Sequence, residues 1–314
     1  MNTDFSFALL CKIKSIGVAL LLIGILWVSG CAPTVPAAPP VPPKSADPKI
    51  ALVLGGGAAR GFAHVGVLRV LEQEKIPLSR IVGTSVGSLV GALYAGNPNT
   101  FELEWAAFQL ERDDVLDFSI FSARTGPVTG NNLERFVDRM VRVKQIESLK
   151  IPYAAVATDL ETGKPVVMDR GPVAKAVHAS SAIPGVFTPV EYGGKLLVDG
   201  GVSNNVPVDV ARQLGADLVI AVNVGQGVQT SRQNLTNVVD IILQAVNIMG
   251  NLIVQTKLRD ADVTIEPRVG QIGAWDFSQK KQAMGAGIEA AQRAIPEIRA
   301  KIQAWKGIGE KPKP

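Results

Sequence analysis

This chain of 314 residues contains few of the side chains that build metal centres, disulfides and histidine-based catalytic sites. It has two cysteines and two histidines. Both cysteines, Cys11 and Cys31, stand near the N-terminus, so the long remainder of the chain cannot form an internal disulfide. No group of His, Cys, Asp and Glu has the spacing of a metal site. We therefore expect a fold held by its apolar core and a site that uses neither a metal nor an organic cofactor.

Long runs of one charge sign are also missing. The formal net charge is +4, from 32 Lys and Arg against 28 Asp and Glu, and the only basic stretch is the short tail KPKP. A nucleic-acid-binding surface requires clustered basic residues, so we expect no nucleic-acid partner. The longest apolar run, Ile16–Val28, has 13 residues. It is too short to cross a bilayer, for which about 20 residues are needed.

The apolar run Ile16–Val28 instead has the length of the core of a secretory signal, and two lysines precede it. The sequence VSGC at its end resembles the lipobox of bacterial lipoproteins. This resemblance implies cleavage after Gly30 and lipid attachment to Cys31, which would anchor the chain in a membrane of the bacterial envelope. The Ala at position 32 favours the outer membrane by the same resemblance. An ordinary signal peptide and an uncleaved anchor are the alternatives.

Composition divides the chain into four segments. Residues 1–30 are the expected lipoprotein signal peptide. Residues 31–48 combine the lipidated cysteine with a tether, because seven prolines among residues 32–48 favour an extended chain of up to roughly 50 Å. Residues 49–306 contain no Pro- or Gly-rich linker and are expected to form one domain, followed by a tail at 307–314. The oligomeric state is left open by the sequence.

From Lys49 onward, short apolar strands alternate with longer helical patterns. The expected strands are Ile50–Leu54, Arg80–Val82, Tyr153–Ala157, Pro165–Met168, Leu196–Val198, Leu218–Val224 and Val263–Glu266. The expected helices are Gly61–Glu74, Ser88–Ala95, Thr100–Glu111, Asn132–Val143, Val173–Ser180, Val206–Leu214, Leu235–Leu258 and Ser278–Gln303. Several strands are apolar on both faces, which is typical of parallel sheets covered by helices on both sides. We predict a three-layer α/β/α sandwich with a largely parallel central sheet.

Two segments are harder to place. Residues 112–130 are the least regular part of the domain and are expected to border a site, because loops carry function. The long helix Leu235–Leu258 is apolar enough to belong to the core, which is our expectation, although a lid or an interface would have the same pattern.

The second expected strand ends in GTSVG, residues 83–87, which matches the pattern G-x-S-x-G. In that pattern a serine sits on a sharp turn from strand to helix, and the flanking glycines allow the two elements to cross closely. The helix N-terminus behind the serine favours negative charge. Ser85 is therefore a candidate nucleophile, with Gly83 and Gly87 forming the elbow. A glycine-rich turn with an incidental serine is the alternative.

The first expected strand ends in GGGAARG, residues 55–61, a loop that would direct backbone N–H groups at negative charge. A phosphate-binding P-loop requires Lys after its last glycine, but Phe62 follows Gly61. A dinucleotide site requires an acid at the end of the second strand, where this chain has Thr84 and Ser85. We therefore expect the loop to face an oxyanion that forms during catalysis.

A serine nucleophile needs a base, and histidine is the usual one. His64 precedes the serine, contrary to the chain order of elbow-type hydrolases, and His178 lies within a helical pattern; we expect both to be structural. Asp199 remains, at the end of an apolar strand and before two glycines. Partial burial would raise its pKa and make it a better base.

Together, GGGAARG, GTSVG and DGG resemble the patatin-like phospholipases in order and spacing, and ASSAIPGVFTPV and ADVTIEP agree. The resemblance covers about residues 49–267. It implies a Ser-Asp dyad without histidine, with Ser85 as nucleophile and Asp199 as proton acceptor. The family's loop often reads G-x-G-x-x-G, and Ala58 stands here in place of the middle glycine.

The resulting hypothesis is a serine acyl hydrolase that cleaves lipid acyl esters through an acyl-serine intermediate. The backbone N–H groups of Gly56, Gly57 and Ala58 would form the oxyanion hole. The resemblance and the predicted anchor imply a phospholipid or lysophospholipid substrate and a role in lipid degradation or membrane lipid turnover. The alternative is a non-catalytic lipid-binding lipoprotein of the envelope. Head group, acyl length and ester position stay open.

Overall fold

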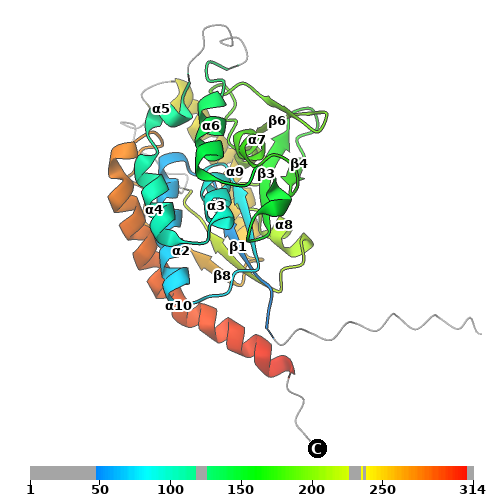
Figure 1. Cartoon of the computed structure of the whole chain (residues 1–314), viewed down its shortest axis with the longest axis vertical. Helices are drawn as coiled ribbons and strands as arrows, with labels where there is room; N and C mark the ends of the chain where they lie inside the picture. The colour runs from blue at the N-terminus through cyan, green and yellow to red at the C-terminus, as the bar shows by residue number, and fades with distance from the viewer. Residues whose placement is uncertain (1–46, 118–125, 226–234, 236–237, 310–314) are drawn as a thin grey trace, which may run out of the picture. The chain divides into compact units, whose positions relative to one another are not determined.

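An eight-stranded mixed sheet forms the centre of the structure, a computed structural model (Figure 1). The structure describes residues 47–117, 126–225, 235 and 238–309, except for the side chains of residues 239, 243 and 306–309. All of them belong to one unit that begins at Lys44. The predicted signal peptide, Cys31 and the tether lie outside the described residues.

The strand order is β5-β6-β3-β2-β1-β7-β8, and β4 pairs with β3. The strands are β1 (Ile50–Leu54), β2 (Arg80–Thr84), β3 (Tyr153–Asp159), β4 (Pro165–Met168), β5 (Val190–Tyr192), β6 (Lys195–Asp199), β7 (Leu218–Val222) and β8 (Val263–Ile265). β3, β2, β1, β7 and β8 run parallel, as predicted. β4, β5 and β6 pair antiparallel. β5 was not predicted, because its three residues, Val190–Tyr192, include a charged and a polar side chain and form no apolar run.

The hairpin between β5 and β6 explains why these two strands are antiparallel. Gly193 and Gly194 connect the two strands with φ values of 57° and 75°. Positive φ at both central residues is typical of a two-residue turn that matches the twist of the strands, and glycine adopts it without strain. The chain therefore reverses at once and does not cross over through a helix, as it would have to between parallel neighbours.

Helices cover both faces of the sheet, which confirms the predicted three-layer α/β/α sandwich (Figure 1). The helices are α2 (Phe62–Gln73), α3 (Val86–Gly96), α4 (Thr100–Gln109), α5 (Arg112–Val115), α6 (Asn131–Met140), α7 (Val173–Ser180), α8 (Val208–Gln213), α9 (Val238–Leu258) and α10 (Lys280–Gly309). The 3-10 helices are η1 (Ala58–Gly61), η2 (Ile146–Ser148), η3 (Gly200–Val202) and η5 (Phe277–Gln279).

Strand alternation in β1 divides the core into two clusters. Leu52 and Leu54 point to one face, where they pack with residues of α2, α3, α4, α6, α7 and α10. Ala51 and Val53 point to the other face, where they pack with α8 and with Val254 of α9. Successive side chains of a strand point to opposite faces, so a strand apolar at every position requires both layers.

The long helix α9 departs from the expectation that it belongs to the core. Its side chains Val238, Ile241, Met249 and Leu252 are between 56% and 77% exposed. Residues 240–258 of α9 are long and apolar enough to cross a membrane by length and composition alone. The expectation of a core helix is wrong because only one face of α9 packs against the domain; the opposite face is apolar and uncovered.

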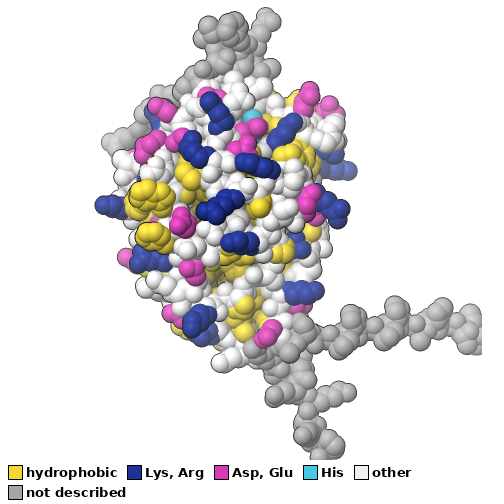
Figure 2. All heavy atoms as spheres, viewed as in Figure 1, with side chains coloured by type: hydrophobic (Ala, Val, Ile, Leu, Met, Phe, Trp, Pro, Cys, Tyr) yellow, Lys and Arg dark blue, Asp and Glu magenta, His cyan; other side chains and the backbone are white. Residues whose placement is uncertain are grey.

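The surface carries a second apolar patch, on α4. Phe101, Trp105 and Phe108 are exposed on α4, at the i, i+4, i+7 spacing of one helix face. Figure 2 shows hydrophobic side chains gathered over α4, at the left of the view. On the same face, Lys and Arg side chains lie among Asp and Glu side chains, and several of them follow one another down the middle of the view (Figure 2).

Candidate active site

Ser85 stands on a strained turn between β2 and α3, as the G-x-S-x-G pattern predicts. Its backbone angles are φ 53° and ψ −127°, outside the regions that side chains normally allow. A Cβ on Gly87 would lie 2.1 Å from the carbonyl oxygen of Leu54, and one on Gly83 would lie 2.4 Å from that of Gly87. Non-bonded carbon and oxygen atoms do not approach this closely unless the backbone shifts. The elbow therefore requires glycine at both positions.

Hydrogen bonds with Ser180 of α7 and with Ser88 of α3 hold this turn in place. The Ser180 hydroxyl, at the end of α7, accepts the Ser85 N–H at 2.9 Å and donates to the carbonyl of Val156 in β3 at 2.6 Å. The Ser88 hydroxyl donates to the Ser85 carbonyl at 2.6 Å. Sequence reasoning assigned no role to Ser180 or Ser88; their only signal was a place in small-residue segments beside a motif.

Sheet register brings Asp199 to Ser85. Thr84 of β2 pairs with Val156 of β3, and the next residue of β3, Ala157, pairs with Asp199 of β6. The nucleophile candidate and the carboxylate therefore lie at the same level of the sheet on either side of β3. The Asp199 carboxylate accepts the Gly201 N–H at 2.7 Å.

The environment of Asp199 changes its acidity. The residue is 6% exposed, and burial raises the pKa of its carboxyl to about 6. Hydrogen bonds from the Ser85 hydroxyl and the Gly201 N–H oppose this rise by favouring the charged form. The balance leaves a carboxylate that is ionised at neutral pH and is more basic than a solvated one.

The glycine loop faces the same space, but its three predicted donors are not equivalent. The Gly56 N–H donates to the backbone carbonyl of Asn205 at 3.3 Å, and the Asn205 side chain donates back to the Gly56 carbonyl at 3.3 Å. No described residue accepts the N–H of Gly57 or Ala58. Ala58 has a φ of 51°, a left-handed conformation that alanine adopts at a cost. The loop therefore offers two unengaged donors where three were expected.

Both histidines have structural contacts away from the Ser85 hydroxyl. His64 is fully buried, and its Nε2 bonds the Gly55 carbonyl at 2.8 Å. Burial lowers the pKa of His64 to about 4, so its ring is neutral and supports the glycine loop from below. His178 pairs through Nδ1 with Glu134 at 2.7 Å. Neither histidine lines the pocket at Ser85.

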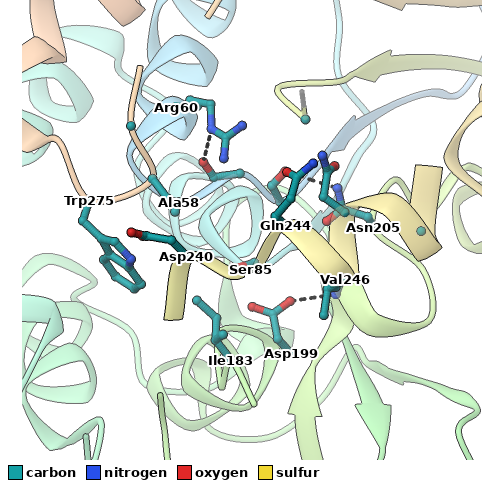
Figure 3. A pocket seen from close by; sticks show the side chains of 18 of the residues that line it. Ala58, Arg60, Ser85, Ile183, Asp199, Asn205, Asp240, Gln244, Val246 and Trp275 are labelled. Atoms are coloured by element: carbon teal, nitrogen blue, oxygen red, sulfur yellow. Dashed lines mark hydrogen bonds between the residues drawn. The ribbon is translucent and has the colours of Figure 1, made fainter. Parts of the chain in front are cut away.

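A pocket with a cavity volume of about 590 Å³ opens above these groups. Figure 3 shows Ser85 between Ala58 and Asp199, with Trp275 on one side and Asn205 on the other. Arg112 lines the pocket, which confirms that the irregular segment 112–130 borders the site. Lining residues that sequence reasoning missed are Arg60, Ile183, Asn205, Asp240, Gln244, Asn247 and Trp275. They come from segments far apart in the chain.

Arg60 is the one cationic residue of the glycine loop, residues 55–61. Its Nε donates to the Gly57 carbonyl at 3.2 Å, drawn as a dashed line in Figure 3. Burial lowers the pKa of Arg60 to about 10, so the guanidinium stays charged at neutral pH. Among the described residues, no three His, Cys, Asp or Glu side chains gather into a group that could hold a metal ion.

Comparison with known proteins agrees with the fold and the motifs. A family model described as patatin-like phospholipase matches residues 52–212. The chain is 41% identical over 181 residues to an uncharacterized NTE family protein of Mycobacterium tuberculosis, covering 57% of this chain and 50% of that protein. It is 40% identical over 189 residues to patatin-like phospholipase domain-containing protein 6 of Homo sapiens, covering 58% of this chain and 14% of that protein.

Among solved structures, VipD from Legionella pneumophila resembles this chain with a TM-score of 0.53 and 13% sequence identity. The match covers 81% of this chain and 67% of VipD. At this identity the likeness concerns the fold. The chain spans about half the length of its mycobacterial relative and a much smaller share of the human one.

Proposed function

The chain belongs to the patatin-like phospholipase family, and from that premise we propose that it is a serine acyl hydrolase that cleaves lipid acyl esters. One observation carries the proposal. Ser85 occupies a strained elbow at a helix N-terminus and lines one pocket together with a buried carboxylate, Asp199, and the unengaged backbone donors of the glycine loop. This combines a nucleophile, a base and an oxyanion site around one pocket, which is the arrangement that acyl transfer requires.

In the proposed mechanism, Asp199 accepts the proton of the Ser85 hydroxyl as Oγ attacks the ester carbonyl carbon. The carbonyl oxygen becomes an oxyanion, which the N–H groups of Gly57 and Ala58 stabilise. Collapse of this intermediate breaks the bond to the alcohol, which takes the proton from Asp199 and leaves an acyl-serine. Water then attacks the acyl-serine while Asp199 again accepts a proton, and the acid and free Ser85 are released.

Burial makes an aspartate suitable for this role. A solvated carboxyl with a pKa near 4 holds an abstracted proton weakly, whereas the pKa of Asp199 lies at about 6. The hydrogen bond from Gly201 fixes the carboxylate orientation. No histidine is needed in this scheme, in agreement with the absence of His64 and His178 from the lining of the pocket.

The substrate is proposed to be a phospholipid or lysophospholipid. The Arg60 guanidinium lines the pocket and stays charged, and a planar cation of this kind suits a phosphate group. The cavity of about 590 Å³ is within the range of pockets that bind molecules of considerable size. Such an activity would serve lipid degradation or turnover of membrane lipids.

We also propose that the enzyme works at a membrane of the bacterial envelope, with the outer membrane favoured. The VSGC sequence supports cleavage before Cys31 and attachment of lipid to it. The uncovered apolar face of α9 supports the same location, because the opposite face of this helix, with Asp240, Asn247 and Val254, lines the pocket. A lipid surface against α9 would lie close to the proposed active site.

The decisive experiment compares Ser85→Ala and Asp199→Asn with the intact protein on a soluble ester and on phospholipid. We expect a loss of at least about a thousandfold in kcat/KM for each variant, since each removes an essential partner of a nucleophile–base pair. A fluorophosphonate probe should label the intact protein and fail to label Ser85→Ala. Circular dichroism checks that both variants fold.

Matched controls are Ser148→Ala and Asp169→Asn, which alter exposed residues outside the pocket and should keep full activity. Near-normal hydrolysis by Ser85→Ala or Asp199→Asn would overturn the proposed pair. Absence of hydrolysis and of probe labelling in the intact protein, together with retained lipid binding, would favour the non-catalytic lipid-binding alternative.

A further inference from the structure

A second, narrower cavity meets the main pocket at Ser85. Its volume is about 70 Å³. The two cavities share four lining residues: Ala58, Ser85, Ile183 and Trp275. Ser85 therefore stands at a junction, with a wide compartment toward Asn205 and α9 and a narrow one toward α3 and α4.

The narrow cavity is built almost entirely from apolar side chains. Only Ser85, Ser181 and the Trp275 indole contribute polar side-chain atoms to its described lining. Most of the remaining side chains come from α2, α3, α4 and α6, and Leu110 follows α4 directly: Phe62, Val65, Val86, Leu89, Val90, Leu93, Leu103, Ala106, Ala107, Leu110, Leu133 and Phe136. The wide compartment, in contrast, is lined by Arg60, Asn205, Asp240 and other polar groups.

The direction of the narrow cavity follows α3 away from the elbow. Leu89 and Leu93 lie four and eight residues beyond Ser85, so Leu93 is about 12 Å along the helix axis. Helix α4 begins four residues after α3 ends, and its first turn carries Leu103. Leu93 and Leu103 thus close the far end. Ala106 and Ala107 leave open space in the wall between the two ends.

We propose that the narrow cavity is the acyl-chain subsite and that it limits the length of the chain transferred to Ser85. This inference rests on the proposed function. An apolar tunnel gains free energy from each buried methylene but offers no partner to a charged head group. The chain whose carbonyl is attacked enters the narrow cavity, and the leaving alcohol with its polar group occupies the wide compartment.

The assignment predicts which residue sets acyl-chain preference. Ala107→Leu places three more heavy atoms in the wall of the cavity, and these atoms displace part of a long chain. Each methylene that can no longer be buried lowers kcat/KM by about fourfold. We expect the ratio of kcat/KM for p-nitrophenyl dodecanoate to that for the butanoate to fall at least tenfold. Gln109→Leu, on the exposed face of the same helix, should leave this ratio unchanged.

Leu93→Ala provides the opposite change, in case Ala107→Leu does not fold. Shortening Leu93 opens the far end, so the preferred ester should move from shorter to longer chains along the series butanoate, octanoate, dodecanoate and hexadecanoate. An unaltered chain-length profile in both folded variants would overturn the subsite. A shift in the same direction for Gln109→Leu would equally overturn it, because that side chain lies outside the cavity.

Failure of the subsite and failure of the proposed function give different results. Labelling of Ser85 by a short-chain fluorophosphonate, with hydrolysis of the butanoate ester, tests the nucleophile without using the deep cavity. Labelling combined with an unaltered chain-length profile rejects the subsite alone. Absence of both labelling and hydrolysis in the folded intact protein rejects the proposed function and the subsite with it.

Discussion

Ala58 and Ser85 line the same pocket from the ends of two adjacent strands, and both have left-handed backbones, with φ values of 51° and 53°. Among the described residues, Lys75 is the only other non-glycine residue with positive φ. Strain of this kind persists only where the surrounding structure enforces it, and it concentrates at functional sites. The backbone strain at Ala58 and Ser85 lowers the stability of the fold, and it places one hydroxyl and one backbone N–H at the same pocket.

Ala58→Gly should relieve part of this strain. A left-handed alanine costs about 1–2 kcal/mol, and the larger entropy of an unfolded glycine offsets part of the gain. We expect the free energy of unfolding to rise by up to about 1 kcal/mol, measured by urea denaturation. Hydrolysis should persist because the donor is a backbone N–H. Ala59→Gly is the control; Ala59 is helical, so its replacement should lower the free energy of unfolding.

The pKa of Asp199 predicts the pH dependence of hydrolysis. The proposed base must be ionised, and burial places the pKa of its carboxyl at about 6. The value of kcat/KM for a soluble ester should therefore rise as the pH increases through about 6 and then level off. A profile that is flat from pH 4 to pH 8 in the folded enzyme would contradict the assignment of Asp199 as the base.

The raised pKa of Asp199 also predicts how the free energy of unfolding depends on pH. Its contribution to stability falls as the pH rises, whereas the rate of hydrolysis increases. The folded-state pKa of Asp199 exceeds the unfolded value of 3.8, so its stabilising contribution is present below that value and is lost as the pH rises through about 6. Comparison with Asp199→Asn isolates this effect, because His64 titrates in both proteins. We expect the difference in the free energy of unfolding, intact minus variant, to fall by about 3 kcal/mol between pH 3.5 and pH 7. Chemical denaturation at each pH measures it.

The outer face of α9 should matter for bilayer substrates and not for soluble ones. Leu252 is 77% exposed, and Leu252→Asp places a charge where we propose contact with lipid. In protein comprising residues 44–314, we expect weaker sedimentation with anionic phospholipid vesicles and unaltered hydrolysis of a soluble ester. Leu160→Asp, at an exposed leucine between β3 and β4, is the control and should sediment normally. Equal sedimentation of the two variants would contradict the prediction.

Cys31→Ala tests the proposed anchor. If lipid is attached to Cys31, the variant should accumulate as an uncleaved precursor and lose incorporation of a labelled fatty acid. Cys11→Ala changes the other cysteine, within the predicted signal, and should be processed and lipidated normally. Lipidated protein of mature size from Cys31→Ala would show that this cysteine is not the attachment site.

Much of the fold could be predicted from local sequence. β1, β4 and α7 have the predicted bounds, because each is a short run bounded by residues that interrupt the strand or helix pattern. Other ends differ by a few residues where a cap decides. Helix α4 begins at Thr100 as predicted, where Asn99 accepts the N–H groups of Phe101 and Glu102, but it ends at Gln109 and not at Glu111. The irregular segment after it contains the unpredicted α5. A single helical turn leaves no periodic signal.

The sequence by itself determined the elbow, because the steric need for glycine at positions 83 and 87 is local to one turn. It also identified Asp199 as a carboxylate at a strand end. Only the tertiary structure decided that Asp199 lies beside Ser85, since this depends on the antiparallel register of β6 across β3. Only the structure showed that Gly56 is engaged by Asn205, that α9 turns an apolar face outward, and that a narrow apolar cavity meets Ser85. Those features arise from contacts between segments far apart in the chain, and local patterns do not encode their geometry.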